Sequence, residues 1–376
     1  MEYLNPQNVT AHRILPLSNI LGMRIQQVFP AGVVDVHLPR VHQLCDGGNV
    51  RLYHPACSIY RISNAIQHPS SSVIRIEHGA IFEKNNRLAA NKEIFQDQDI
   101  QACELGIIYL RNPENIIKVG SAFSLLGVHA SHWAHFLIQF LPKLIFSGRQ
   151  IQAVGTIVIQ KNLDSHIMEL IRDNISNSVK IIEIDKNEYA DFDQMYFCSE
   201  VAYVCDHADY TGIADIVIPK ITRQVVAKTL NKFSDNCGVS QSKVDSTHIF
   251  VAYDGKRGAI NAAEVELFFK HKGYFVVRPH LLTLKQKVQI FSKAEKVVGI
   301  ASSGMTNIFF CKKQVNVLGF INYERAFDAY MGQFFDEYPN LNMTSYVGQR
   351  VGESGINSAY FLDLNSLRIL LPQLGF

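Results

Sequence analysis

Short apolar runs separated by turn residues fill the first part of the chain. Between about residues 20 and 105, glycine, proline and asparagine interrupt the apolar positions every few residues, and no helical period runs through this stretch. Such a pattern predicts short strands joined by turns. We therefore expect a β-rich N-terminal region at residues 1–105, with strands at Ile25–Phe29, Val33–Leu38, Val50–Tyr53, Ser58–Ile62, Val73–Glu77 and Ala80–Phe82.

Beyond residue 106 the apolar pattern alternates between strands and helices. Strands are expected at Ile107–Leu110, Thr156–Ile159, Lys180–Ile184 and Met195–Ser199, and helices at His132–Lys143, Ser165–Asn174 and Ile213–Asn231. This alternation is typical of a parallel sheet that helices cover on both faces. We interpret residues 106–232 as a Rossmann-like, doubly wound domain.

A second alternating series follows a polar stretch. Residues 233–246 are rich in Ser, Asn and Gly and have no apolar period, which is typical of a linker. After it we expect strands at His248–Tyr253, Tyr274–Arg278, Lys296–Ile300 and Val315–Phe320. Residues 247–330 are thus a second Rossmann-like domain. Two such domains with a polar joint predict an α/β protein with a cleft between its halves.

Helices of the second domain are marked by their caps. Asn261 is followed three residues later by Glu264, which is a capping-box arrangement, and Thr283 caps the next helix. A third helix is expected at Met305–Cys311. Residues 331–376 form a C-terminal segment, which we expect to be mostly loop before a closing helix at Ser366–Leu374.

The helix His132–Lys143 lies in an uncharged run from Val119 to Pro142. At helical spacing one polar stripe runs along it, formed by His132, His135, Gln139 and Lys143. Because a buried polar group without a partner costs about 2–7 kcal/mol, the stripe needs buried partners or a water-filled cleft. We favour the cleft and leave the core helix open as the alternative. The run is long enough to span a membrane, but its histidines and its proline argue against that.

Charge and cysteine content narrow the class of protein. The chain of 376 residues has 36 Lys and Arg against 34 Asp and Glu, without a block of like charge, which argues against a nucleic-acid partner. Its seven cysteines include no CxxC pair, so we expect reduced thiols and neither disulfides nor zinc. The N-terminus lacks a signal-peptide pattern. We expect a cytoplasmic protein, leave attachment to the inner face of the membrane open, and cannot derive the oligomeric state.

Small residues at one strand-to-helix turn suggest an anion site. A helix N-terminus presents amide groups and partial positive charge, so a diphosphate can bind there. The turn of the second domain contains Ser302, Ser303, Gly304, Thr306 and Asn307, and an earlier turn at the same sheet edge carries Lys256 and Arg257. The alternatives, a plain serine-capped turn and a solvated loop, stay open.

Two aspartates resemble a metal-binding triplet. Asp191 and Asp193 are separated by one residue, as in the DxD motif that holds a divalent metal against a sugar-nucleotide diphosphate. Aspartates just before a strand are more often turn residues. We therefore do not expect a metal.

Two motifs resemble those of glycosyltransferase family 61, which includes bacterial capsular polysaccharide enzymes and eukaryotic xylosyl- and N-acetylglucosaminyltransferases. The first family motif, N-x-x-H-[FW]-L-x-[DE]-x-L-P-[RK]-L, is similar to residues 132–144 but has an Asn where this chain has His132 and a carboxylate where it has Gln139. The second, G-P-H-G-A-G-L-T-N-x-x-F, is similar to residues 299–310, with Ala301 in place of the histidine. The resemblance covers about residues 105–325.

The resemblance implies a GT-B fold, in which two Rossmann-like domains face a cleft and the C-terminal segment packs back on the first lobe. It also implies a nucleotide-sugar donor, held mainly by the second half, and inversion at the anomeric carbon. We expect a UDP-sugar, a glycan or lipid-linked glycan acceptor, and no required cofactor or metal.

Site roles follow from this implied chemistry. Inverting transfer needs a general base for the acceptor hydroxyl and positive or amide partners for the leaving diphosphate. His135 is the expected base or acceptor-orienting group, and His132 is the second choice. The expected donor-binding residues are Lys256, Arg257, Ser302, Ser303, Gly304, Thr306 and Asn307, with Glu324 on the ribose hydroxyls.

Three functions are compatible with these features. The leading hypothesis is an inverting glycosyltransferase of surface polysaccharide or lipopolysaccharide biosynthesis. The second is a pyruvyl- or phosphoryl-transferring enzyme on the same fold. The third is a non-catalytic relative that binds a glycan or nucleotide, which the departures at Gln139 and Ala301 motivate.

Overall fold

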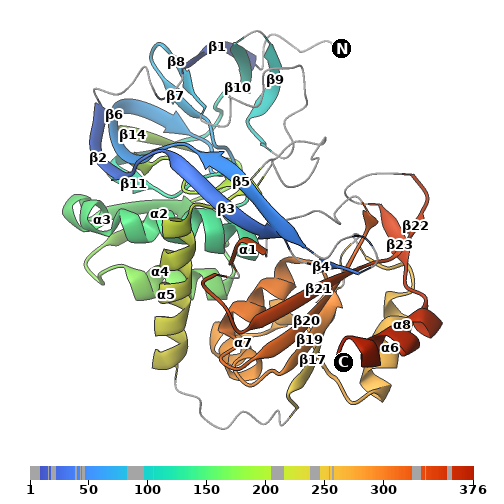
Figure 1. The fold of residues 1–376 in the computed structure, drawn as a ribbon. Coiled ribbons are helices and arrows are strands. Elements are labelled where there is room, and N and C mark those ends of the chain that lie inside the picture. Colours follow the sequence, from blue (N-terminus) through green and yellow to red (C-terminus); the bar gives the residue numbers. More distant parts are fainter. Residues whose placement is uncertain are drawn as a thin grey trace. The chain divides into compact units, whose positions relative to one another are not determined.

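The computed structural model describes residues 9–15, 17, 23–38, 40–42, 44, 47–82, 97–104, 106–204, 216–237, 246–253, 255, 258–323, 332–334, 336–353 and 358–376. The chain divides into two units. The first spans residues 1–32 and 54–210, and the second spans residues 33–53 and 211–376. Helices and large sheets are present, which confirms the predicted α/β class (Figure 1). The domain limits expected from the sequence remain predictions.

A mixed sheet with eleven described strands organises the first unit. Ten follow the spatial order β13-β12-β11-β14-β6-β7-β8-β1-β10-β9, and β2 pairs with β6. The strands are β1 Val9–Leu15, β2 Arg24–Phe29, β6 Cys57–Gln67, β7 Ile74–Ile76, β8 Gly79–Ile81, β9 Ile100–Glu104, β10 Ile107–Arg111, β11 Ile116–Ser124, β12 Thr156–Gln160, β13 Lys180–Ile184 and β14 Tyr189–Cys198.

The strand β11 was not predicted, although it is central to the parallel part of this sheet. It pairs in parallel with β12 on one side and with β14 on the other. Gly120 within it has φ +71°, and the register with β14 shifts on both sides of this glycine. Such an irregularity breaks the two-residue alternation by which a strand is recognised. Strand order reverses at β11, so its end is a topological switch point.

Buried apolar side chains from the strands of this sheet form one core cluster, which includes Ile62, Phe192 and Met195. Two helices accompany the parallel strands, α3 (Gly148–Val154) and α4 (Ser165–Asn174). The bounds of α4 are those predicted. The left-handed Gly155 (φ +74°) ends α3 and leads directly into β12.

A parallel sheet organises the second unit. Its spatial order is β18-β17-β19-β20-β21-β4, and every neighbouring pair is parallel. The strands are β4 Arg40–Val41, β17 His248–Val251, β18 Phe275–Val277, β19 Lys296–Ile300, β20 Val315–Ile321 and β21 Leu341–Val347. From β17 to β21 this is the doubly wound order 2-1-3-4-5, whose switch point lies between its first and third strands. Here these are β17 and β19.

The sixth strand of this sheet comes from the N-terminal part of the chain. Arg40 donates from Nη2 to Oγ1 of Thr344 at 3.2 Å, and the ring of His42 stacks on Tyr346. The neighbouring strands β3 (Gly32–Leu38) and β5 (Gly48–His54) form a two-stranded sheet. Strands were predicted near these positions, but the sequence did not indicate which sheet residues 40–41 would join.

Helices lie on both faces of the second sheet, with α7 (Leu284–Phe291) on one and α6 (Ala262–His271) and α8 (Leu364–Gln373) on the other (Figure 1). Phe269 of α6 and Leu367 of α8 share a buried cluster with the sheet. Helix α8 thus belongs to this unit's core, whereas the resemblance implied a segment that packs on the first lobe. The other elements are β15 Tyr203–Val204, β16 Ile216–Val217, α5 Lys220–Asn236, β22 Gln349–Val351, β23 Ala359–Phe361 and 3-10 helices at Pro279–Leu281, Ser303–Phe310 and Gly332–Phe334.

Three element predictions in the second unit were wrong in detail. The helix expected at Ile213–Asn231 begins only at Lys220, because Pro219 disfavours helical geometry in the residue before it, and it continues to Asn236 within the predicted linker. The helix expected at Met305–Cys311 is a 3-10 helix at Ser303–Phe310. The stretch expected as loop after residue 330 contains β21, whose apolar alternation is masked by polar residues at positions 342, 344 and 345.

The two predicted helix caps differ. Thr283 forms the expected cap, and with Gln286 it completes a capping box. The side chain of Asn261 makes no cap bond; its Nδ2 donates to the carbonyl of Leu362 and its Oδ1 accepts from the amide of the same residue. Asn261 therefore ties the start of α6 to the segment before α8.

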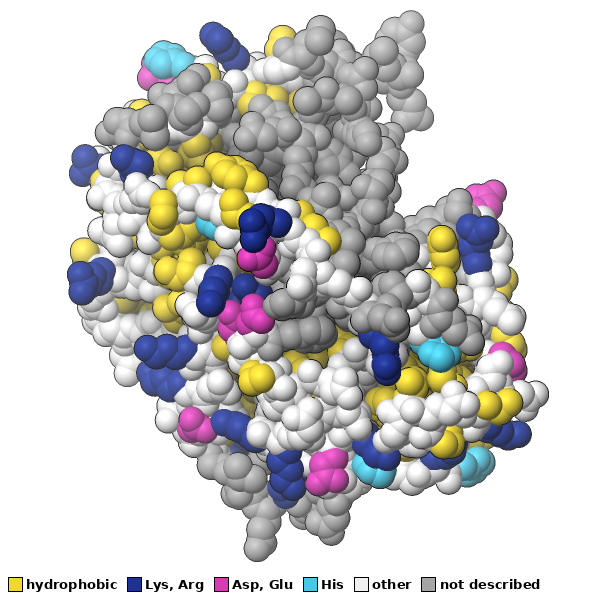
Figure 2. Space-filling view, viewed as in Figure 1, with side chains coloured by type: hydrophobic (Ala, Val, Ile, Leu, Met, Phe, Trp, Pro, Cys, Tyr) yellow, Lys and Arg dark blue, Asp and Glu magenta, His cyan; other side chains and the backbone are white. Residues whose placement is uncertain are grey.

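No helix in the described parts of the chain is long and apolar enough to cross a membrane. On the face drawn in Figure 2, lysine and arginine side chains lie singly or in small groups, with acidic side chains among them.

Candidate functional site

The predicted polar-striped helix is present, but it is not a regular α-helix. The amide of Leu141 donates to the carbonyl of Phe136, five residues earlier. Pro142 follows directly, and in an α-helix its ring would crowd the carbonyl of Ile138. The wider π turn relieves this crowding, and such turns are frequent at functional sites. The segments are α1 (Trp133–His135), a π-helical turn (Phe136–Phe140) and α2 (Leu141–Phe146).

Exposure decreases along the polar stripe from His132 to Gln139. His132 is exposed, His135 is half-buried and the side chain of Gln139 is almost completely buried. Nδ1 of His135 lies 2.8 Å from Oε1 of Gln139. The amide oxygen can only accept, so the imidazole donates. The stripe predicted from helical spacing is therefore confirmed for this pair.

A third imidazole joins the stripe. The ring centroid of His129 lies 4.3 Å from that of His135 and 5.0 Å from that of His132, and the Nδ1 atoms of His129 and His132 are 3.1 Å apart. His129 has φ +67°, which side-chain-bearing residues rarely adopt. His129 was not expected in the site, because its left-handed backbone lies before the helix and outside the helical spacing.

Among the residues that the structure describes, no group of three or more His, Cys, Asp or Glu side chains has the geometry of a metal site. The DxD pair lies inside β14 and not in the predicted turn before it. Asp191 lies opposite Lys118 in the backbone register of β14 and β11, and Asp193 is exposed.

The inner end of the stripe is charged. Nζ of Lys143 lies 3.0 Å from Oε1 of Glu200, and the two side chains are 12% and 9% exposed. Glu200 follows β14, far from Lys143 in the sequence, so helical periodicity gave no sign of this pair. A cation and an anion that are both largely desolvated interact much more strongly than a surface pair does.

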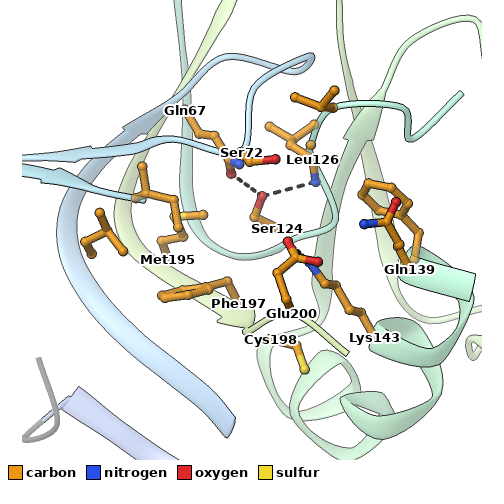
Figure 3. Close-up of a pocket in the computed structure, with 15 residues that line it drawn as sticks. Gln67, Ser72, Ser124, Leu126, Gln139, Lys143, Met195, Phe197, Cys198 and Glu200 are labelled. Carbon is orange, nitrogen blue, oxygen red and sulfur yellow. Dashed lines mark hydrogen bonds and ion pairs between the residues drawn. The ribbon is translucent and has the colours of Figure 1, made fainter. Parts of the chain in front are cut away.

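Figure 3 shows a pocket at this end of the stripe. Its solvent-accessible volume is about 30 Å³, enough for about two water molecules. The hydroxyl of Ser124 donates to Oε1 of Gln67 at 2.7 Å and accepts from the amide of Leu126. The polar lining is formed by Gln67, Ser72, Ser124, Gln139, Lys143 and Glu200. The stripe therefore has buried partners and also reaches a polar cavity. The sequence left a core helix and a water-filled cleft open as alternatives, and this helix has features of both.

The position of the pocket follows from the topology. Residues 126–128, which follow β11, and Glu200, which follows β14, both line it. Strand order reverses between these strands, and in α/β sheets ligands bind beyond the carboxyl ends of strands at such a point. The pocket is thus where the fold of the first unit predicts a ligand site.

A buried ionic network supports one pocket wall. Asp97 accepts from the amides of Ser72 and Asp99 and from the hydroxyl of Ser71. Burial raises the pKa of Asp97 to about 6. Asp99 pairs with Arg75 and accepts from the Tyr189 hydroxyl at 2.9 Å. Burial is also the main cause that raises the pKa of Tyr189.

In the second unit, the turn after β19 lies beside the carboxyl end of β17, because Val251 is paired with Gly299. Ser303 is exposed, and Ser302 and Gly304 are half-buried. Thr306 and Asn307 are buried, and their side chains donate to the carbonyls of Ser303 and Gly304, both at 2.7 Å. In this structure the last two residues fix the backbone of the turn, and the first three form its surface.

Two glycines lie close to Val251 around this turn, and only at Gly299 would a Cβ meet the backbone. A Cβ at Gly299 would lie 2.7 Å from the carbonyl oxygen of Val251, and one at Gly304 would lie 3.2 Å from its Cγ1. Ala301, which replaces the motif histidine, packs against the apolar pair Val41 and Ile321. The turn therefore packs closely against Val251 and has an apolar side chain at position 301.

Three of the predicted donor-binding residues, Lys256, Arg257 and Glu324, lie outside the described residues. The structure brings His129, His132, His135 and Gln139 together in the first unit and Ser302, Ser303, Gly304, Thr306 and Asn307 together in the second.

A protein-family model described as "Glycosyltransferase 61" matches residues 133–318. The match begins at the polar-striped helix and ends in β20, and it includes the turn after β19. No curated protein matches the chain.

Proposed function

The chain belongs to glycosyltransferase family 61, and we propose that it is an inverting glycosyltransferase that moves a sugar from a nucleotide-diphosphate donor to a glycan acceptor. The observation that carries the proposal is the position of His135, one helical turn before a polar pocket at the switch point between β11 and β14.

Inversion at the anomeric carbon requires one general base. In our proposal His135 accepts the proton of the acceptor hydroxyl as this oxygen attacks the sugar carbon and the bond to the diphosphate breaks. A neutral imidazole is suited to this step near neutral pH. His132, which is exposed and contacts His129, is the second candidate.

The donor diphosphate is proposed to bind at the turn after β19. The amides at the start of the 3-10 helix Ser303–Phe310 and the surface of Ser302, Ser303 and Gly304 are suited to an anion. Thr306 and Asn307 hold the turn in shape, and Lys256, Arg257 and Glu324 complete the proposed donor set. With Ala301 no imidazole reaches the donor from that position, so the amides carry more of the binding.

Finer parts of the proposal rest on the family. They are a GT-B arrangement, which the doubly wound order of the second unit supports, a UDP-sugar donor without a required metal, and a lipid-linked or free glycan acceptor. The pathway is proposed to be surface polysaccharide or lipopolysaccharide synthesis in the cytoplasm, at the inner face of the membrane.

A thermal-shift panel tests the donor class. UDP, GDP, CDP, CMP and ADP are each added at millimolar concentration with and without Mg²⁺ or Mn²⁺. A nucleotide at about a hundred times its dissociation constant stabilises the folded state by about 2.7 kcal/mol, which is a shift of about 5–11 °C for units of this size. We expect one nucleotide to produce this shift without added metal.

The variant Ser303→Glu tests whether the nucleotide binds in the second unit. A carboxylate on the exposed surface of the turn repels a diphosphate, so the shift should disappear in this variant. Ser178→Glu, the same change at an exposed serine of the first unit, should retain it. Absence of a shift with every nucleotide would favour the pyruvyl-transfer or non-catalytic alternatives.

A further inference from the structure

Gln139 contacts the proposed base directly, but it cannot itself take part in proton transfer. Its side chain is 2% exposed and its Oε1 faces Nδ1 of His135 at 2.8 Å. The π-helical turn that carries it is held by apolar neighbours that are all buried, Phe136, Leu137, Ile138 and Phe140. The amide is therefore fixed in place before any substrate binds.

We propose that Gln139 is a positioning residue that holds neutral His135 in the tautomer with the proton on Nδ1, so that the basic lone pair is on Nε2. This inference rests on the proposed function, in which His135 is the general base. An amide oxygen accepts and never donates, so a ring nitrogen that bonds to it must carry the hydrogen. The neutral ring then carries its basic lone pair on the other nitrogen.

The absence of charge on Gln139 has a second consequence. A carboxylate in the same place would accept the same hydrogen bond and would also stabilise the imidazolium that forms when His135 takes a proton. The amide fixes the tautomer without this stabilisation. The substitution Gln139→Glu therefore tests the effect of that charge.

Two further described imidazoles lie close to His135. The rings of His129 and His132 lie 4.3 and 6.1 Å from its ring, centroid to centroid, so a charge on either disfavours a second charge on His135. Further along the stripe, the ammonium of Lys143 is paired with Glu200. The charge of that carboxylate is therefore largely offset before it can act on the imidazole.

The tautomer is measured first in the unmodified protein. In protein labelled with ¹⁵N-histidine, the two ring nitrogens have different chemical shifts when they carry the hydrogen and when they carry the lone pair. The signals of His135 are those that vanish in His135→Asn. We expect the hydrogen on Nδ1. Predominance of the Nε2–H tautomer would overturn the inference, whatever the variants do.

Two variants then separate the hydrogen bond from the charge. Gln139→Glu keeps the acceptor and adds a charge, so the titration midpoint of His135 should move up by about 1–2 pH units. The acidic limb of the pH–rate profile should move by the same amount. Gln139→Leu removes the acceptor, so the tautomer preference should be lost and kcat should fall at least tenfold with KM nearly unchanged. An unmoved midpoint in Gln139→Glu would overturn the inference.

These readouts distinguish the inference from the proposed function, because the NMR measurements need no substrate. If His135→Asn is inactive but the wild-type ring carries its hydrogen on Nε2, the inference fails and the proposed function stands. If His135→Asn retains full activity, the assignment of His135 as the base fails together with this inference, because Gln139 then positions no base, whereas the transfer of a sugar stands.

Discussion

Lys143→Met should strongly destabilise the first unit. The substitution removes the cation that faces Glu200 at 3.0 Å and leaves the carboxylate in a site where its side chain is 9% exposed. Removing one partner of a fully buried pair costs about 3–5 kcal/mol, and exposed pairs contribute about 0.2–1 kcal/mol. Since both partners are about nine-tenths buried, we expect a loss of about 3 kcal/mol. For a unit of this size that corresponds to about 6–12 °C in Tm.

The assay can follow this unit alone. The chain contains a single tryptophan, and Trp133 is buried in the first unit against the ring of His166. Tryptophan fluorescence during urea denaturation therefore reports the unfolding of that unit. Double variants of Lys143 and Glu200 then give the coupling energy between the two side chains.

The matched control is the more exposed pair of Lys161 and Asp185, whose side chains are 49% and 30% exposed. Lys161→Met should change the unfolding free energy by less than about 1 kcal/mol. If Lys143→Met destabilises no more than this control, or if the coupling energy of Lys143 and Glu200 is close to zero, our account of a desolvated ion pair at the pocket is wrong.

Three further predictions concern stability. Burial raises the pKa of Asp97 to about 6 in the folded state. Protonation of Asp97 therefore stabilises the folded state by about 3 kcal/mol below about pH 4, and this contribution is lost as the pH rises through 6. Asp97→Asn should abolish this part of the pH dependence in urea denaturation; an unchanged profile would refute it. Gly299→Ala should destabilise the second unit by about 1–3 kcal/mol, because the new Cβ would lie 2.7 Å from the carbonyl oxygen of Val251. The control Gly148→Ala has open space around it and should leave stability unchanged; equal circular-dichroism melting curves for the two variants would contradict this. Thr283→Ala removes the capping box of α7 and should lower the unfolding free energy by about 1 kcal/mol, measured by circular-dichroism melting. An unchanged melting curve would show that the cap does not stabilise the fold.

The regular parts of the fold were predictable because their periods are clean. The parallel strands β17, β19 and β20 have continuous apolar runs, and α4 has the bounds that its pattern indicates. The strand β11 was missed because a left-handed glycine breaks its alternation. The strand β4 was missed because it has two residues and gains its place only by pairing with β21, which is distant in sequence.

The candidate site, too, could be predicted only in part from the sequence. Helical spacing placed His135 and Gln139 on one stripe, because four residues make about one turn. It could not show His129 over the stripe, which depends on an unusual backbone angle, or Glu200 beside Lys143, which depends on the path of β14. Thr306 and Asn307 were recognised as motif residues, but only the structure shows that their side chains bond to their own turn.

The central claim is that this chain transfers a sugar with His135 as the base. The most direct test incubates the protein with a panel of nucleotide sugars and a mixture of glycan acceptors and measures nucleotide release, with the anomeric configuration of the product determined by NMR. We predict release with one donor, a product of inverted configuration, and a rate about 10²–10⁴-fold lower in His135→Asn. Equal rates for the wild-type protein and His135→Asn, or a product of retained configuration, would contradict the account.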